Sequence, residues 1–373
     1  RKSPPKTAAQ LEKEREERLA RLRKEKEKKK PNVEFGNFVS LPHEPKSAAD
    51  GNQVPACFYK PGHWTSTVLS AKANHFKING SLETAVVSGG GGRVGLPGVP
   101  YSMSGRRSAP LPKGQPKSFR SVLFVPVRAG GAMAVNRLEA RKGGLGTYEK
   151  SDALRRMPSY QYNFVVLARY PENYSYVKGL DSVKRPTELD FEDLTQGDTY
   201  YRIQLLKAER RAALPSYGLF WTSTAYVLWD DANPDALTLD QQVAILDWLH
   251  WGGQLIISGP ESLDALRNSF LGEYLPAESV RSRTIGEEEV AALSDAWTIA
   301  VRNQPTLPLT AIRTWSGIEL KKHPEARFLD GTGDLLVERN VGRGRIVVSA
   351  FGLSNPDLLA WPSFDGFFNA CLL

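Results

Sequence analysis

The sequence predicts an α/β protein whose main domain is built around parallel strands. Two short apolar runs, at residues 226–229 and 255–257, flank a segment with helical spacing. An acidic turn follows the first run, and a glycine pair precedes the second. Short apolar runs of this kind are typical of strands that are covered on both faces. Because a helix between two such strands implies a right-handed parallel crossover, residues 226–259 predict one βαβ unit.

We expect the helix of this unit at residues 239–251. Thr238 precedes it, and its hydroxyl can cap the first exposed backbone N–H groups. Gly252-Gly253 ends it, because glycine tolerates the left-handed backbone that closes many helices. Spacings of three and four place the apolar residues on one broad face that we expect to be buried. These residues are Val243, Ile245, Leu246, Trp248 and Leu249.

The predicted α/β domain covers residues 157–373. We expect residues 162–168 and 345–351 to be strands of the same sheet as the two strands of the βαβ unit, because they are also apolar runs. Other elements are expected as a strand at 200–206, helices at 261–270 and 287–296, and a hairpin of 335–339 with 345–351 around Gly342-Arg343-Gly344.

Residues 54–156 differ from the rest of the chain in their residue pattern, and this pattern predicts a small antiparallel β-sandwich domain. Strand-like segments occur at 65–69, 81–87 and 119–126, and no helical pattern is evident among them. A segment rich in Gly, Pro and Ser, residues 88–117, is expected to be a loop.

The positive charge of the chain is concentrated at its beginning. The net charge is +8, but residues 1–30 hold 13 Lys and Arg against six Glu, which leaves 36 basic and 35 acidic residues elsewhere. We therefore expect residues 1–31 to be a solvated, partly helical spacer and residues 32–53 to be a linker. A nearly neutral body argues against nucleic-acid binding, whereas the tail itself could contact an anionic membrane surface or nucleic acid.

Targeting signals and cysteines give little information about the location or the chemistry of the protein. No apolar run approaches the roughly 18 residues that a membrane-spanning helix needs. The chain begins with Arg, so we expect a preceding segment, such as a signal peptide or a membrane anchor, that the sequence does not include. Cys57 and Cys371 are far apart and lack metal-ligand spacing.

Two motifs resemble those of a known family. Leu246, Trp248 and Gly252-Gly253 lead into Leu255-Ile256-Ile257, and a late Gly342-Arg343-Gly344-Arg345-Ile346-Val347-Val348 strand follows. This pattern resembles the class I glutamine-amidotransferase-like domains of bacterial envelope proteins. With its Lys60-Pro61-Gly62-His63-Trp64 segment, the whole chain looks like planctomycete-type envelope proteins. The resemblance implies a parallel-sheet, flavodoxin-like domain, a place on the periplasmic side of the envelope with a possible membrane anchor, and protein partners or self-assembly.

The sequence departs from that family at the reactive position. Active amidotransferases carry a cysteine on the turn after the strand, together with a downstream histidine, whereas this turn reads Ser258-Gly259-Pro260. His323 is the only downstream histidine, and it lies in a polar segment. An activated hydroxyl needs a base within hydrogen-bond reach, and the sequence offers no clear one. Ser258 is thus either a nucleophile or a residue that satisfies the backbone of a strand-end turn.

Three acidic residues form the second candidate site. Asp230, Asp231 and Glu261 follow two predicted parallel strands, and α/β folds bind ligands at the carboxyl ends of such strands. They could hold a ligand or a metal ion, or they could cap a turn and begin a helix. Because three acids without a histidine are a loose metal signature, we predict no metal site and no cofactor.

These observations support three hypotheses about function. The first is a non-catalytic cell-envelope module for interaction or assembly, a pseudoenzyme that retains an amidotransferase-like fold. The second is a hydrolase or amidotransferase that uses Ser258 or the acids Asp230 and Asp231. The third is a cytoplasmic regulator that binds nucleic acid through the basic tail.

Overall fold

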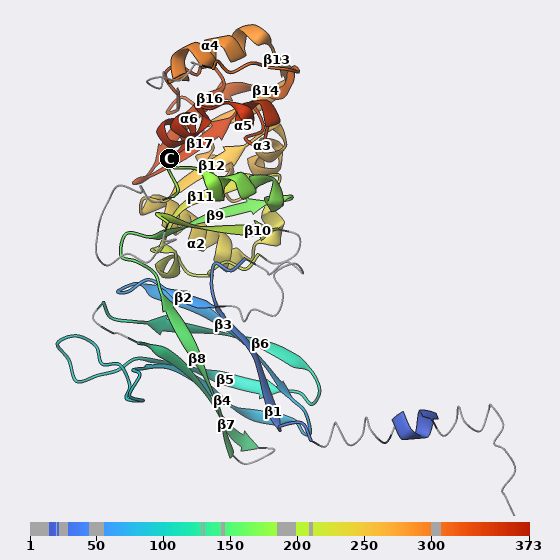
Figure 1. Ribbon diagram of the computed structural model, residues 1–373, viewed down its shortest axis with the longest axis vertical. Coiled ribbons are helices and arrows are strands. Elements are labelled where there is room, and N and C mark those ends of the chain that lie inside the picture. Colours follow the sequence, from blue (N-terminus) through green and yellow to red (C-terminus); the bar gives the residue numbers. More distant parts are fainter. Residues whose placement is uncertain are drawn as a thin grey trace, which may run out of the picture. The chain divides into compact units, whose positions relative to one another are not determined.

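A computed structural model describes residues 15–19, 21, 29–44, 56–127, 129, 131–142, 146–184, 199–208, 212–299 and 307–373 (Figure 1). These residues form two compact units. The first unit takes its residues from Arg1–Val39, Val54–Cys57 and Ser66–Arg155, and the second takes its residues from Ser40–Gln53, Phe58–Thr65 and Arg156–Leu373. The predicted basic spacer lies outside the described residues apart from 15–19, 21, 29 and 30, as does the linker beyond residue 44.

The β-rich part of the chain contains two sheets. A three-stranded sheet has the order β1 (Val33–Ser40), β3 (Trp64–Ala73), β6 (Pro116–Phe124). A five-stranded sheet has the order β2 (Cys57–Tyr59), β8 (Gly146–Arg156), β7 (Met133–Lys142), β4 (Ile78–Val87), β5 (Ser104–Leu111). The fully buried side chains of Leu69, Ile78 and Leu111 belong to the core here.

Two of these strands differ from the sequence-based expectation. β1 lies within the predicted linker, where Phe38 and Val39 are buried although the segment is short and glycine-containing. β5 lies within the predicted loop, and its first five residues are not buried, so it shows no apolar alternation. Both strands are specified by pairing with neighbours distant in sequence rather than by their own composition.

The second unit is organised around a seven-stranded sheet. Its order is β10 (Tyr201–Lys207), β9 (Tyr162–Ala168), β11 (Thr224–Asp230), β12 (Gln254–Ser258), β17 (Gly344–Ser349), β16 (Leu336–Val341), β15 (Arg327–Phe328). The first five strands are parallel to one another, and β16 and β15 are antiparallel to their neighbours. A separate antiparallel pair consists of β13 (Ala277–Ile285) and β14 (Trp315–Lys322).

The predicted fold class, a parallel-sheet flavodoxin-like domain preceded by a β-sandwich, is therefore wrong. The chain is a mixed α/β protein with several antiparallel and mixed sheets. The predicted hairpin of β16 and β17 is present, and it turns at Gly342, whose φ is 61°. Because this hairpin reverses the chain within the main sheet, the sheet cannot be wholly parallel. β13 and β14 were not predicted, since β13 is largely exposed and polar.

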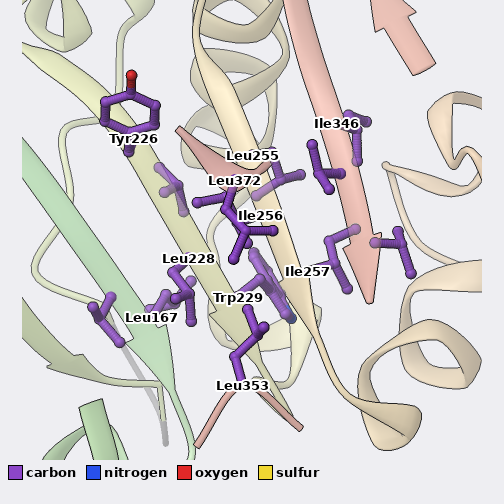
Figure 2. Packing of buried hydrophobic residues seen from close by; sticks show 14 of the residues in the cluster. Leu167, Tyr226, Leu228, Trp229, Leu255, Ile256, Ile257, Ile346, Leu353 and Leu372 are labelled. Atoms are coloured by element: carbon purple, nitrogen blue, oxygen red, sulfur yellow. The ribbon is translucent and has the colours of Figure 1, made fainter. Parts of the chain in front are cut away.

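The predicted βαβ unit is confirmed. β11 pairs with β12 in parallel, with Leu228 opposite Ile256. Figure 2 shows how apolar side chains of β11, β12 and β17, among them Trp229, Ile257 and Ile346, fill the core. All three side chains are fully buried.

Helix α2 (Leu239–His250) connects β11 and β12. Thr238 and Gln241 form a capping box at its start, so the predicted cap is present with an additional partner. Its buried residues are Gln241, Ala244, Ile245, Trp248 and Leu249. Val243, which we expected on the buried face, is instead 50% exposed, and Leu239 is 74% exposed. The helix therefore buries a narrower stripe than its apolar content predicts.

The remaining helical elements are short. The α-helices are α3 (Pro260–Arg267), α4 (Glu287–Trp297), α5 (Pro356–Ala360) and α6 (Phe364–Phe367). The other helical turns are η2 (Pro171–Gly179), η3 (Gly218–Trp221), η4 (Pro234–Ala236), η5 (Gly272–Tyr274) and η6 (Phe368–Leu372). Within the ranges given above, no helix has both the length and the hydropathy that a membrane span requires.

The two edge strands of the seven-stranded sheet, β15 and β10, differ in length and in their contacts. At one edge β15 is a strand of two residues that pairs with β16. At the other edge, the Glu44 carboxylate accepts a hydrogen bond from the backbone N–H of Leu205 in β10, at 3.2 Å. Lys178 forms an ion pair with the same carboxylate at 3.2 Å.

Candidate functional site

The carboxyl ends of the parallel strands bring the predicted site residues to one edge of the sheet. The chain places β10 on one side of β9 and then continues with β11 on the other side. In open α/β sheets, a reversal of this kind leaves a crevice at the carboxyl ends of the two strands between which it occurs, here β9 and β11. Ligands bind in such crevices. Asp230 ends β11 and Ser258 ends β12, while Glu261 lies in the first turn of α3. With Tyr174 of η2, we name these residues the carboxyl-edge cluster.

Ser258 is fully buried within this cluster. Its Oγ lies 2.7 Å from the hydroxyl oxygen of Tyr174 and accepts a hydrogen bond from the backbone N–H of Leu353 at 3.0 Å. The Ser262 hydroxyl donates to the carbonyl oxygen of Ser258 at 2.7 Å. Ser258 therefore connects β12 to η2 and to the segment after β17, and its hydroxyl is part of the interior.

The carboxyl group of Asp230 has a raised pKa. Burial raises the pKa of its carboxyl group to about 6, and the nearby negative charges of Glu261 and Asp231 act in the same direction. Hydrogen bonding with Tyr174 and Ser258 opposes this increase. A carboxyl group whose pKa lies near neutrality can exchange a proton under physiological conditions, which general acid or base chemistry requires.

Gly259 lets the two carboxylates approach the same point. Its φ is 76°, a left-handed conformation that glycine adopts without strain. A Cβ atom placed on it would lie 3.5 Å from Glu261 Oε2 and 3.6 Å from Asp230 Oδ1. The carboxylates of Asp230 and Glu261 thus both lie close to Gly259, which has no side chain to separate them.

Asp231 is held beside the cluster by local contacts. Its φ of 46° is unusual for a residue other than glycine, although aspartate tolerates this region better than most. Its backbone N–H donates to Ser262 Oγ at 2.9 Å, and its Oδ2 pairs with the exposed Arg169 guanidinium at 3.1 Å. These contacts fit the turn-capping interpretation of Asp231.

The Glu261 side chain borders two clefts. It lines a cleft of about 620 Å³ together with Arg313, Trp315, Asn355 and Asp357. It also lines a second cleft of about 480 Å³, which includes Asp264 and Arg283. Neither cleft is lined by Ser258 or Asp230. Of the three predicted acids, Glu261 is the one that a ligand in these clefts would contact.

The structure brings no predicted histidine into the cluster. His323 lines a different cleft with Arg267, Lys321 and Lys322. The His250 Nδ1 atom lies 2.8 Å from the carbonyl oxygen of Leu246, on α2. The described part of the chain contains no group of three or more His, Cys, Asp or Glu side chains placed to hold a metal ion.

Sequence reasoning missed three residues of this region: Tyr174, Arg169 and Ser262. Arg169 directly follows β9, so its position at the carboxyl edge could have been inferred from the predicted strand at 162–168. Ser262 stands four residues after Ser258, a spacing that allows a bond back to the Ser258 carbonyl. Tyr174 lies in a short helical turn without a periodic pattern, so the sequence carries no comparable signal for it.

Comparisons with known proteins do not assign the chain to a family. No protein-family model matches it, and no curated protein resembles it in sequence. The exo-β-1,4-mannosidase Op5Man5 from Opitutaceae bacterium strain TAV5 is similar over 58% of this chain and 37% of its own length, with 13% identity and a TM-score of 0.31. The sporulation control protein Spo0M from Bacillus subtilis is similar over 34% of this chain and 50% of its own, with 12% identity and a TM-score of 0.22.

A third solved structure, BslA, a bacterial hydrophobin, is similar over 35% of this chain and 99% of its own, with 12% identity and a TM-score of 0.20. The chain spans about a third to a half of the mannosidase and the sporulation protein. Likenesses of this size carry no argument about what the chain does.

Proposed function

We propose that the chain is a non-catalytic interaction module of the bacterial cell envelope. The observation that supports this proposal is the environment of Ser258. A nucleophilic hydroxyl must reach its substrate, whereas the Ser258 hydroxyl is fully buried and occupied by Tyr174 and the backbone N–H of Leu353. The position that would carry a reaction in an amidotransferase instead stabilises the interior. The envelope location is part of the proposal, and the sequence resemblance alone supports it.

The outer face of α2 supports an interaction role. Leu239 and Val243 stand four residues apart and are 74% and 50% exposed. Leu219 of η3 and Tyr217, which precedes η3, are also exposed, and η3 packs beside α2 at Asp247. We name these four residues the α2 face. The exposed parts of these side chains are not covered by the rest of the described chain, and exposed apolar surface marks sites of protein association.

We take the partner to be a second copy of the chain. Leu239 and Val243 form a ridge of four-residue spacing, and such ridges pack into the grooves of a facing helix. Across a two-fold axis, the same ridge meets itself, which is the commonest arrangement in homodimers.

Sedimentation velocity over a range of protein concentrations tests the interaction role. The purified chain should associate as concentration rises, and Leu239→Ser combined with Val243→Ser should weaken association at least about tenfold. Asp240→Ser, an exposed change on the same helix, is the matched control and should leave it unaltered. A chain that stays monomeric at every concentration, or a double variant that associates like the wild type, contradicts the proposed role of the α2 face.

Hydrolysis assays test the absence of catalysis. Glutamine and a p-nitrophenyl ester are the probes, and neither should be turned over above the uncatalysed rate. The result that contradicts the proposal is turnover that disappears in Ser258→Ala while the variant stays folded.

A second candidate function, a hydrolase that uses acidic residues, is favoured by Asp230. Its pKa of about 6 and the adjacent Glu261 supply an acid and a base at the edge where α/β proteins bind ligands. The same ester assay separates the two candidates. For this hydrolase, Asp230→Asn abolishes turnover and Ser258→Ala preserves it.

The third hypothesis, nucleic-acid binding through the tail, concerns residues that lie mostly outside the described ranges. It stays a prediction, as does contact of residues 1–30 with a membrane surface.

A further inference from the structure

A cleft at the opposite edge of the seven-stranded sheet combines features of a ligand site. It has a volume of about 420 Å³ and lies where β9, β10, β11 and β12 begin. Residues that line it include Tyr162, Tyr201, Thr224, Tyr226, Trp251 and Gln254. We name it the amino-edge cleft. It lies at the opposite sheet edge from the carboxyl-edge cluster, and η3 and the end of α2, which border the α2 face, also line it.

The lining of this cleft is aromatic and uncharged. Six of the residues that line it are Tyr or Trp, and none of the lining residues is Asp, Glu, Lys, Arg or His. The clefts beside Glu261 contain charged residues of both signs. Lys60 and His63 contact Tyr162 and Thr222 from outside the lining. Because an ion would lose its hydration in the amino-edge cleft and meet no charged lining residue, the lining favours a neutral ligand.

Two buried polar atoms in the cleft have no hydrogen-bond partner among the described residues. They are Thr224 Oγ1 and Gln254 Oε1. Thr224 is 5% exposed and lines the cleft, so a molecule in the cleft is a candidate partner for its hydroxyl. The register between β9 and β11 shifts between Thr224 and Tyr226, at the start of β11, and irregularities of this kind often occur next to binding sites. Buried polar groups without partners are rare in folded proteins, and a ligand is one means of satisfying them.

Trp251 provides a surface for stacking. It caps the end of α2 and is 57% exposed, although it lines the cleft. The neighbouring rings of Trp221 and Trp248 are packed on each other, with centroids 5.5 Å apart. The exposed part of the Trp251 indole is therefore available for stacking.

We propose that the amino-edge cleft binds a neutral pyranose ring of a saccharide. The C–H face of the sugar packs on the Trp251 indole, and a sugar hydroxyl donates to Gln254 Oε1. Thr224, whose hydroxyl both donates and accepts, pairs with a second sugar hydroxyl. A nucleotide does not fit this chemistry, because no cation lines the cleft to meet its phosphate.

Titration with methyl pyranosides of glucose, galactose, mannose and N-acetylglucosamine tests the proposal. Binding is followed by tryptophan fluorescence and by saturation-transfer NMR. At least one pyranoside should bind saturably, and Trp251→Ala should lower its affinity about tenfold, as expected for the loss of one stacking contact. Ile312→Ala, a change at a residue that is 80% exposed outside the cleft, is the control and should bind like the wild type.

Thr224→Val preserves the shape of the side chain and removes the unpaired hydroxyl. It should raise the melting temperature of the free protein and lower the affinity for the sugar, a pair of effects that a purely structural threonine would not produce. The proposal is overturned if no pyranoside gives a saturable signal, if indole binds and the sugars do not, or if Trp251→Ala and Thr224→Val bind with unchanged affinity.

Discussion

The hydroxyl groups of Tyr174 and Ser258 lie 2.7 Å apart in the interior of the protein, and each supplies the other with a hydrogen-bond partner. The two residues are 84 positions apart in the chain. Their contact joins the η2 turn to the end of β12. The contact lies at the carboxyl edge of the sheet, where α/β proteins usually bind ligands.

Ser258→Ala should lower the free energy of unfolding by about 1–3 kcal/mol, because the variant leaves the Leu353 N–H buried without a partner and removes one partner of the Tyr174 hydroxyl. Urea denaturation measures the change. Tyr174→Phe should cost less when Ser258 is already replaced, so the double variant should show a coupling between the two sites. Equal unfolding midpoints for Ser258→Ala and the wild type would contradict this account.

Asp230 should make the protein less stable as pH rises from about 4 to 6. Its carboxyl pKa is about 6 in the folded protein against a usual value of 3.8, so the folded state binds more protons than the unfolded state within that window. The stabilisation is complete below the window and is lost above it. Asp230→Asn should remove this fall and should be more stable than the wild type at pH 7.5, by on the order of 2 kcal/mol.

Urea unfolding at several pH values between 4 and 7.5 checks the Asp230 prediction. Asp264→Asn, at an exposed residue of α3, provides the control and should preserve the wild-type profile. If Asp230→Asn shows the same loss of stability with pH as the wild type, another group is responsible.

Gly253 should not tolerate a side chain. A Cβ atom there would lie 2.2 Å from the Trp248 ring, which is itself buried. Gly253→Ala should therefore destabilise the protein by about 1–3 kcal/mol, and Gly253→Asp should prevent folding because it adds a charge at the same point. Thermal melting followed by circular dichroism measures both. Gly179→Ala, where a Cβ meets no atom within 4 Å, should melt close to the wild type.

Glu338 is the buried centre of an ion-pair network. It pairs with Arg345 at 3.1 Å and with Arg327 at 2.6 Å, and its side chain is only 7% exposed. Glu338→Ala should cost about 3 kcal/mol, because Arg345 is left partly buried without its counter-charge. Glu319→Ala, which breaks the exposed pair with Arg281, should cost less than about 1 kcal/mol. Similar unfolding free energies for the two variants would show that burial does not govern these pairs.

The local sequence pattern was sufficient to predict the strands that are buried on both faces of the sheet. The apolar runs of β11 and β12 and the cap at Thr238 predicted a parallel crossover that the structure contains. The overall fold class was not predictable in the same way. β13 and β5 are mostly exposed, so their apolar content resembles that of a loop, and pairing with distant strands decides their conformation.

The candidate site was predictable only in part. Asp230, Ser258 and Glu261 could be placed at one sheet edge because each follows or ends a predicted strand. Ser258 contacts Tyr174 and Leu353, which are 84 and 95 positions away in the chain. The sequence near Ser258 does not predict contacts between residues so far apart. Whether Ser258 and the acids have a functional role stays a prediction.

The two-residue strand β15 has a consequence for how copies of the chain can join. Unpaired N–H and C=O groups along a sheet edge act as a template onto which another molecule can add a strand, and such growth leads to fibres. A terminal strand of two residues presents almost no template, and at the far edge the Glu44 carboxylate occupies the Leu205 N–H that an incoming strand would need. Backbone pairing between molecules is thus disfavoured at both edges of this seven-stranded sheet, so an assembly formed at these edges has to rely on side chains.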